Sequence, residues 1–405
     1  MHRTPLLSAG LIAGTLTAFL GVAVAVPAQA AGGWSAPVGL PISGGLPAAA
    51  VNASGAAVAI TSGPTASGTV AVSVSTSADG HTWTAPVTLG PGGEPAVALA
   101  PTGRAVAVWQ GFSGVTPAGL QASVLVPGGT WSAPVTVAPA GINPEVAVDA
   151  AGDAVALWST ASSNAPVQAA ILRAGGTWSA PVALGTGVTP NLAVNPSGAI
   201  LAGWTASPHE TVVSAGTVTG GWSAPVTLGP ATAYKQLGVH LALAANGQGT
   251  ALWTGGNGVQ AATLSPGGSW TAPVILAPGS STVAMGLAAD GTGDTVALLA
   301  KNVDIGSTIG YSLETARHAP GGGWTALTQL ASESSQSGKI AATPAGSFVV
   351  IYVGNAVTSP PGQGFGAPVS LAPSNSAMQL AAAAGHALAV WAAGSSLTAA
   401  TEPVT

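Results

Sequence analysis

A short motif, Trp-Ser/Thr-Ala-Pro-Val, recurs along this chain at intervals of 41 to 54 residues. It begins at Trp34, Trp83, Trp131, Trp178, Trp222 and Trp270, weakens to Trp-Thr-Ala-Leu at Trp324, and ends as Phe-Gly-Ala-Pro-Val at Phe365. Repeats of this length are typical of propeller blades or of helical arrays. Because the repeats cover residues 31–405 almost evenly, we predict a single repeat domain over that range.

The pattern inside one repeat favours strands over helices. In the unit from Pro144 to Leu184, three short Val-rich runs and the motif itself are separated by turns containing Gly, Asn or Pro. The Pro of the motif lacks a backbone N–H, which suits the outer edge strand of a sheet. We therefore predict an all-β fold, an eight-bladed β-propeller of four-stranded antiparallel blades. Seven blades is the alternative, because the sixth repeat is long and the seventh is degenerate.

The two ends of the repeat array complement each other. The last repeat contains only three strand-like runs, at Gln379–Ala383, His386–Trp391 and Leu397–Thr401. The segment Trp34–Leu40 is a fourth run without a blade of its own. We predict that this N-terminal strand completes the last blade and closes the ring, which removes the open ends of a linear array.

The first thirty residues have the pattern of an export signal. A short basic start at Arg3 is followed by an apolar run from Leu6 to Val26 and by Ala28-Gln29-Ala30. This is the order of regions in a secretory signal peptide. We predict cleavage after Ala30 and a secreted, extracellular protein; the alternative is an uncleaved membrane anchor.

Composition excludes several classes of function. The chain has seven basic and twelve acidic residues among 405, and no Cys. Nucleic-acid binding requires clustered Lys and Arg, and disulfides, thiolate metal sites and thiol nucleophiles require Cys. The pairs Asp149/Asp153 and Asp290/Asp294 occupy equivalent turns, where Asp is favoured for turn geometry rather than for Ca²⁺. We predict no cofactor and no metal.

One turn carries a family resemblance. Ser77-Ala-Asp79-Gly80-His-Thr82-Trp83 resembles the Asp-box of sialidase-like (BNR-repeat) propellers, with one residue missing. The resemblance implies a propeller fold and a structural role for the box. Sialidases of this fold use an arginine triad, whereas Arg104, Arg173 and Arg317 lie in turns on one rim. We interpret them as surface residues without a role in catalysis, and we do not predict sialidase activity.

Two columns of equivalent residues stand out when the repeats are aligned. The first ends the second strand of each repeat and is mostly aromatic: Thr61, Trp109, Trp158, Trp204, Trp253, Leu299, Tyr352 and Trp391. Stacking of sugars is one interpretation, and packing between blades is the one we favour, both here and for the motif tryptophans.

The second column is the position that we expect at the start of each innermost strand. It reads Ala48, Ala96, Glu145, Asn191, His240, Gly286, Lys339 and Gln379, and it is polar at a place where its neighbours are small and apolar. We place it at the mouth of the axial channel, with loop residues nearby at Glu94, His209, Glu210, Tyr234, Lys235, Lys301, Asp304 and Glu333. The candidate ligand-binding residues are Glu145, Asn191, His240, Lys339 and Gln379; the alternative is that these side chains only face water.

These observations predict an exported, non-catalytic binding or scaffold module. The expected partner is a polysaccharide, surface glycan or cell-wall component held at the channel-mouth column, with no nucleic acid, no membrane after signal cleavage, and a monomeric state. Two alternatives stay open. One is a glycoside hydrolase that uses Glu145 with a second carboxylate, and the other is a purely structural or adhesive surface protein.

Overall fold

The computed structural model describes residues 33–45, 47–65, 68–231, 238–304, 309–333, 336–373 and 378–404. These residues form β-strands, turns and irregular segments, and none of them is helical. Accordingly, no described helix has the length and apolar character needed to cross a membrane. The predicted signal peptide, residues 1–30, lies outside the described residues.

Strands of four kinds alternate along the chain, according to their place between the centre and the outside of the ring. The innermost strands are β2 (Ala48–Val51), β9 (Ile142–Val148), β16 (His240–Leu243), β20 (Thr282–Ala289), β24 (Lys339–Ala342) and β28 (Met378–Ala383). The second strands are β3 (Ala57–Pro64), β6 (Ala105–Ser113), β10 (Ala154–Ser159), β13 (Ala199–Ala206), β17 (Gly249–Gly255), β21 (Thr295–Asp304), β25 (Phe348–Tyr352) and β29 (His386–Ala393).

The third strands are β4 (Val70–Ser77), β7 (Thr116–Leu125), β11 (Ala165–Leu172), β14 (Glu210–Thr217), β18 (Gly258–Leu264), β22 (Ile309–His318), β26 (Asn355–Ser359) and β30 (Ser396–Pro403). The outer strands are β1 (Val38–Ser43), β8 (Val135–Ala138), β15 (Val226–Pro230), β19 (Val274–Pro278), β23 (Thr328–Glu333) and β27 (Val369–Ser370). Two long strands, β5 (Val87–Leu99) and β12 (Val182–Val194), are outer in their first half and innermost in their second half.

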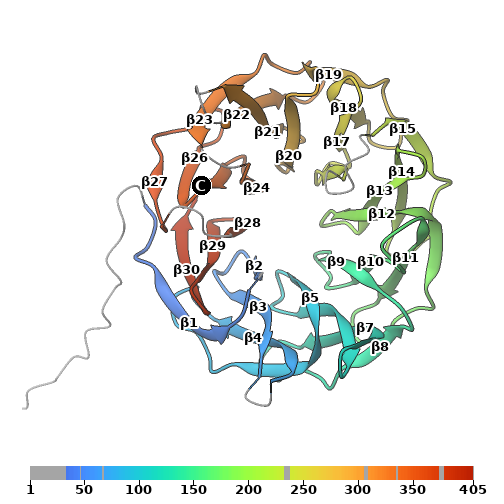
Figure 1. Ribbon diagram of the computed structural model, residues 1–405, viewed down its shortest axis with the longest axis vertical. Helices are drawn as coiled ribbons and strands as arrows, with labels where there is room; N and C mark the ends of the chain where they lie inside the picture. Colours follow the sequence, from blue (N-terminus) through green and yellow to red (C-terminus); the bar gives the residue numbers. More distant parts are fainter. Residues whose placement is uncertain are drawn as a thin grey trace, which may run out of the picture.

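The sheets stand radially around a common centre, which is the arrangement of a β-propeller (Figure 1). Over the described residues, four sheets have four strands and two sheets have seven. Each seven-stranded sheet arises because β5 or β12 pairs with β4 or β11 through its first half and with β6 or β13 through its second half. Antiparallel pairing runs through every sheet, as the alternating runs of the sequence predict.

The N-terminal segment pairs with the last strand of the chain. In the β1–β30 ladder, Val38 lies opposite Ala399 and Leu40 lies opposite Leu397. The backbone N–H of Ser35 also donates to the carbonyl of Thr401 over 2.7 Å. The predicted pairing of the first and last segments is therefore present, and it covers the edge of the β28–β30 sheet.

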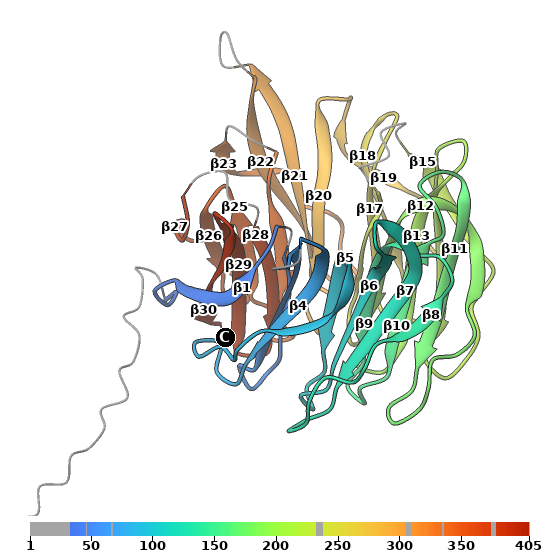
Figure 2. The same ribbon diagram turned by 60° about the horizontal axis from the view of Figure 1, so that its bottom comes forward.

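The extra length of the repeat between Trp270 and Trp324 lies in one hairpin. Strands β21 and β22 are ten residues each, and Figure 2 shows their hairpin extending past the ends of the neighbouring strands. The radial packing of the sheet is unaffected, because β21 pairs with β20 and β22 in the usual order. The repeat is long because the hairpin of β21 and β22 is longer, not because the sheet contains another strand.

The hydrophobic core lies between neighbouring blades rather than at one centre. The second strands are the most buried; every residue of β10 and β17 is buried, because a neighbouring blade covers each face of the sheet. Trp109 of β6 packs against Val58, Ile60 and Val72 of the preceding blade. Small Ala and Val side chains let the blades approach closely, and the indoles fill the space that remains.

Candidate functional site

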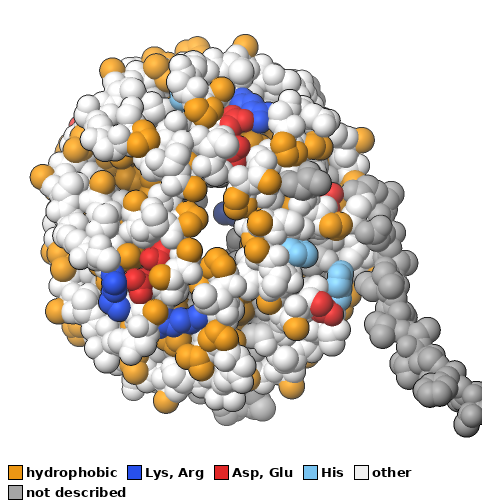
Figure 3. All heavy atoms as spheres, turned by 180° about the vertical axis from the view of Figure 1, so that it is seen from behind, with side chains coloured by type: hydrophobic (Ala, Val, Ile, Leu, Met, Phe, Trp, Pro, Cys, Tyr) orange, Lys and Arg blue, Asp and Glu red, His pale blue; other side chains and the backbone are white. Residues whose placement is uncertain are grey.

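The polar column forms one register position in all of the innermost strands. Each member pairs with the residue that precedes the aromatic column, as in Glu145 opposite Leu157, His240 opposite Leu252 and Lys339 opposite Ile351. The remaining pairs are Ala48–Ile60, Ala96–Val108, Asn191–Gly203, Gly286–Leu298 and Gln379–Val390. The repeat alignment therefore identified equivalent positions. Figure 3 shows the hollow at the centre of the ring, with a basic side chain visible inside it.

The column does not start every innermost strand, which corrects the prediction that it is the first residue of each of them. It does so in β2, β16 and β24, but β9 begins three residues before Glu145 and β12 continues without a break before Asn191. The ladders contain β-bulges just before the column, between the partners Val188 and Asn191 for example. In these blades the strand therefore begins before the column, and the bulge interrupts the ladder next to it.

Three of the bulges place a non-glycine residue in the left-handed region. Glu94, Asn143 and Thr189, each two residues before a column position, have φ angles of 51°, 49° and 52°. The carboxylate of Glu94 accepts a hydrogen bond from the backbone N–H of Asn143 in the next blade, at 2.8 Å. Glu94 was predicted as a rim residue, and the structure gives it this link between blades.

Asn191 also links two blades. Its Oδ1 accepts a hydrogen bond from the backbone N–H of Leu241, 50 residues further along, at 2.9 Å. A buried backbone N–H without a partner is costly, so this bond is a sufficient reason for Asn at this position. Asn191 was predicted to bind a ligand, whereas its side-chain oxygen is engaged with the framework.

Glu145, His240 and Lys339 belong to three different blades, and the charge of Lys339 acts on each of the other two. Burial raises the pKa of Glu145 to about 7, and the charge of Lys339 lowers it in part. Burial also lowers the pKa of His240 to about 4, as does the charge of Lys339, and a hydrogen bond with the Ala284 backbone opposes this shift. Glu145 and His240 are only partly exposed, deep within the ring, whereas Lys339 is exposed. At neutral pH Glu145 is therefore close to the midpoint of its titration, and the imidazole of His240 is neutral.

Replacement of Glu145 by Gln is expected to stabilise the fold at high pH and not at low pH. The folded protein holds the Glu145 proton more tightly than the unfolded chain, so stability falls as the pH rises from 4.5 to about 7. The full shift corresponds to about 3 kcal/mol. Partial exposure to channel water reduces the expected gain to about 1–2 kcal/mol above pH 7.

The measurement is chemical denaturation of both proteins at pH 4.5 and at about pH 8. His240 titrates in both proteins, so its contribution cancels in the difference between them. An equal difference in unfolding free energy at the two pH values would contradict the assignment of Glu145 as the titrating group.

The other predicted rim residues are dispersed. Tyr234 and Lys235 lie outside the described residues, as does the side chain of Asp304. His209 and Lys301 are exposed, and Glu210 begins β14. Burial raises the pKa of Glu333. Gln379 is half-buried in the column.

The three mature-region arginines join blades instead of forming a triad. Arg104 is 8% exposed and donates to the carbonyl of Gly152 in the next blade. Arg173 donates to the carbonyl of Val218 at 2.9 Å and pairs with Asp153. The prediction that these were surface residues without a role was therefore wrong in part: they have no catalytic arrangement, but they hold neighbouring turns together.

Arg317 repeats this arrangement between two other blades. Its guanidinium pairs with Asp294 and donates to the carbonyl of Gln363 at 3.1 Å. The carboxylate of Asp290 accepts three backbone N–H groups, from residues 292, 293 and 294. These acidic residues serve the turns, and no group of three or more His, Asp or Glu within the described part of the chain could hold a metal ion.

Asp79 of the box-like segment organises its turn in the same way. Its carboxylate accepts hydrogen bonds from the backbone N–H groups of His81 and Thr82, both at 2.8 Å. The Thr82 bond is the largest reason why the pKa of Asp79 is lowered, which shows that the ionised form is held by the turn. The segment is structural.

The aromatic columns differ from each other in exposure. All five tryptophans of the first column are buried between blades, inside the second strands rather than at their ends, so the packing interpretation is correct for them. The motif tryptophans lie nearer the circumference, where Trp34 is 1% exposed and Trp83, Trp131, Trp178, Trp222, Trp270 and Trp324 are only partly buried. Packing therefore explains the first column fully and the motif column in part.

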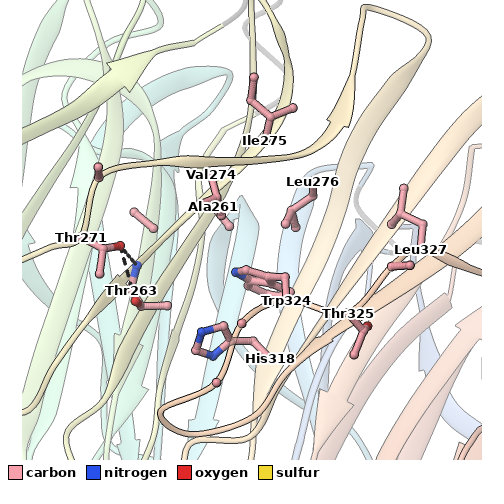
Figure 4. A pocket seen from close by; sticks show the side chains of 15 residues that line it. Ala261, Thr263, Thr271, Val274, Ile275, Leu276, His318, Trp324, Thr325 and Leu327 are labelled. Atoms are coloured by element: carbon pink, nitrogen blue, oxygen red, sulfur yellow. Dashed lines mark hydrogen bonds between the residues drawn. The ribbon is translucent and has the colours of Figure 1, made fainter.

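A groove that sequence reasoning missed lies beside one of these half-buried indoles. It has a volume of about 520 Å³ and runs between the third and outer strands, β18 and β19, of one blade and the end of β22 in the next. Figure 4 shows Trp324 and His318 on one side, facing Val274 and Leu276 on the other. His318 was the sequence signal for this groove. It occupies the position that pairs with the motif tryptophan through an isolated β-bridge, and that position is Leu125, Leu172 and Leu264 in three other repeats.

Comparison with known proteins gives likenesses in structure only. No family model matches the chain, and no curated protein matches it. The BP39L lectin from Burkholderia pseudomallei is 12% identical with a TM-score of 0.55, covering 82% of this chain and 100% of that chain. The six-bladed fungal lectin of Aleuria aurantia is 14% identical with a TM-score of 0.40, covering 72% and 96%.

The β-propeller domain of the Trilobed protease from Pyrococcus furiosus is 7% identical with a TM-score of 0.43, covering 73% of this chain and 90% of that chain. At such identities a likeness shows the fold alone. The chain is thus similar in architecture to β-propeller proteins, in agreement with its radial sheets.

Proposed function

We propose that this protein is an exported, non-catalytic β-propeller that binds carbohydrate in its central channel. The observation that carries the proposal is that Glu145, His240 and Lys339 occupy equivalent positions in the innermost strands of three separate blades, and that the charge of Lys339 acts on both Glu145 and His240. Together with Gln379 they offer donors and acceptors to hydroxyl groups. The BP39L lectin, which is similar in fold, is a carbohydrate-binding protein by name, and this supports the ligand class.

Binding is favoured over hydrolysis by the composition of the column. A glycoside hydrolase of the usual kind needs two carboxyl groups within about 5 to 10 Å. Glu145 has a pKa suited to a general acid, but it is the only carboxylic acid among the eight column residues. The remaining members are apolar, amide, imidazole or ammonium groups, which supports recognition without bond cleavage.

We also propose that the ring has eight blades and that residues 31–405 form one domain. Dividing β5 and β12 at their midpoints turns each seven-stranded sheet into two four-stranded units, which with the four remaining sheets makes eight. Eight column positions and eight occurrences of the motif support the same number. The monomeric state remains a proposal that gel filtration with light scattering would test.

The triple change Glu145→Ala, His240→Ala and Lys339→Ala is expected to abolish carbohydrate binding and to leave the fold intact. The framework accepts Ala at Ala48 and Ala96 of the same column, so the polar side chains are not needed for packing. The measurement is a glycan and wall-polysaccharide array, followed by calorimetry on the best ligand.

The matched control is Asn191→Ala. It removes the hydrogen bond to Leu241 and should cost about 0.5–1.5 kcal/mol of stability, but it should leave binding nearly unchanged. Unchanged binding in a well-folded triple variant would reject the channel as the site.

Export is expected to remove the first thirty residues. The basic start, the apolar run and the Ala28-Gln29-Ala30 end together carry this proposal. N-terminal sequencing of protein secreted into the culture medium should begin at Ala31. Material that begins at Met1 would contradict it.

A further inference from the structure

We propose that the groove between β18–β19 and β22 is a separate binding site for a neutral pyranose, with Trp324 and His318 as its recognition residues. The proposal rests on the carbohydrate-binding function proposed above, but not on the channel. The groove lies on the outer side of two neighbouring blades, whereas the polar column lines the centre of the ring. Its volume of about 520 Å³ falls within the usual range of small-molecule sites.

Departures from the repeat converge on this groove. His318 stands at a position that is Leu in three other repeats and Ser77 or Gly216 in two more, and Leu327 replaces the Pro that other motifs have three residues after the aromatic residue. On the facing blade, Ile275 stands where four other repeats have Thr or Ala after the motif Val, and it is 53% exposed. These residues come from two repeats and meet only because the blades are adjacent. Substitutions that arise independently in separate repeats are not expected to line the same groove.

His318 is the polar group that the repeat framework does not require. It is 8% exposed, its ring lies 5.2 Å from the Trp324 ring, and its Nδ1 has no hydrogen-bond partner outside its own residue among those described. Burial lowers its pKa, although its own backbone and Asp294 oppose the shift, so the imidazole is neutral at pH 7. Its Nδ1 is itself buried, so Nε2 is the ring nitrogen left to donate to or accept from a sugar hydroxyl in the groove.

The lining defines the ligand class. No Asp, Glu, Lys or Arg lines the groove, so a charged ligand would find no counter-charge. The half-buried indole of Trp324 offers an apolar face, and Val274 and Leu276 line the groove opposite it. The Thr325 hydroxyl accepts the backbone N–H of Arg317 at 3.0 Å, which leaves its O–H to donate. A neutral pyranose has the matching combination of one apolar face and equatorial hydroxyls.

The test observes Trp324 directly. The protein is labelled with 5-fluorotryptophan, the Trp324 signal is assigned as the one missing from Trp324→Phe, and methyl glycosides of glucose, galactose, mannose, fucose and N-acetylglucosamine are titrated by ¹⁹F NMR. At least one glycoside should shift the Trp324 signal saturably, and the equivalent Trp270 signal should stay in place. His318→Leu should weaken this binding by about tenfold or more.

His318→Leu should fold normally, because Leu264 occupies the equivalent position and packs near Trp270. The Glu145/His240/Lys339 triple-alanine variant should keep the Trp324 response, which separates this site from the channel. Any of three results would overturn the proposal of a pyranose site in the groove. These are a Trp324 signal that no glycoside shifts, an unchanged glycoside affinity in His318→Leu, and an equal response of the Trp270 signal. Loss of the Trp324 response in the triple-alanine channel variant would show that the groove and the channel are not independent sites. This conclusion would hold whether or not that variant still binds carbohydrate in the channel.

Discussion

Deletion of residues 31–42 from the mature protein is expected to leave a chain that no longer holds a stable ring. The deletion removes Trp34, Leu40 and Ile42, which are 1%, 5% and 1% exposed and pack against the last blade and its neighbours. Large-to-small changes at such sites cost about 2–5 kcal/mol for Leu or Ile and about 3–5 kcal/mol for Trp, which gives roughly 7–15 kcal/mol in all. A whole domain is stable by about 5–15 kcal/mol. The loss is therefore comparable with the total.

The same deletion uncovers β30, whose ladder with β1 is then unpaired. An exposed edge strand of this length favours association between molecules. We expect aggregation, seen by light scattering, together with a loss of the cooperative thermal transition. A synthetic peptide of residues 33–43 added in trans should restore the transition, because it supplies the missing strand. A truncated protein that melts like the full mature chain would show that the ring does not depend on this closure.

The architecture was predictable because its cause is local and repeated. The motif interval, the turn residues and the Pro before each outer strand are all visible within one repeat, and each copy adds to the same inference. The pairing of Trp34–Leu40 with the last strand followed from counting strands, and the β1–β30 ladder agrees with it. The resemblance in the Asp79 turn added little, since that segment organises only its own turn.

The details of the candidate sites depend on contacts between repeats, which one repeat cannot reveal. The bulge at Thr189 has a non-glycine residue in the left-handed region, so the extension of the strand before the column was not predictable. Asn191 was a reasonable ligand-binding residue by type, but its partner Leu241 lies 50 residues away. Arg104 reaches Gly152 across 48 residues. In each case the side chain that deviates from the repeat serves the next blade.

The groove was not predictable from single repeats, because it too depends on contacts between neighbouring blades. His318 and Ile275 deviate from the repeat in different units, and each alone is unremarkable. They form one surface only when the outer strands of two consecutive blades face each other. In a propeller, deviations should therefore be compared between adjacent repeats at their facing positions, as well as within one column.

Replacement of Trp158 by Ala is expected to cost about 3–5 kcal/mol of unfolding free energy, and replacement of Trp178 by Ala clearly less. Trp158 is 0% exposed and packs against Val108, Leu120 and Val137 of the preceding blade, so truncation leaves a cavity between two blades. Trp178 belongs to the motif column, is half-buried, and can be replaced in part by water. Urea denaturation of both variants measures the difference.

The indole nitrogens supply a finer control for the same measurement. Trp253 donates from Nε1 to the carbonyl of Pro230 at 3.2 Å, whereas Nε1 of Trp158 has no partner among the described residues. Trp253→Phe should therefore cost about 1 kcal/mol more than Trp158→Phe. Equal costs for the two Ala variants would mean that the aromatic column does not pack the blades together. The buried indoles would then need another explanation, because at 0–2% exposure none of them can stack on a sugar.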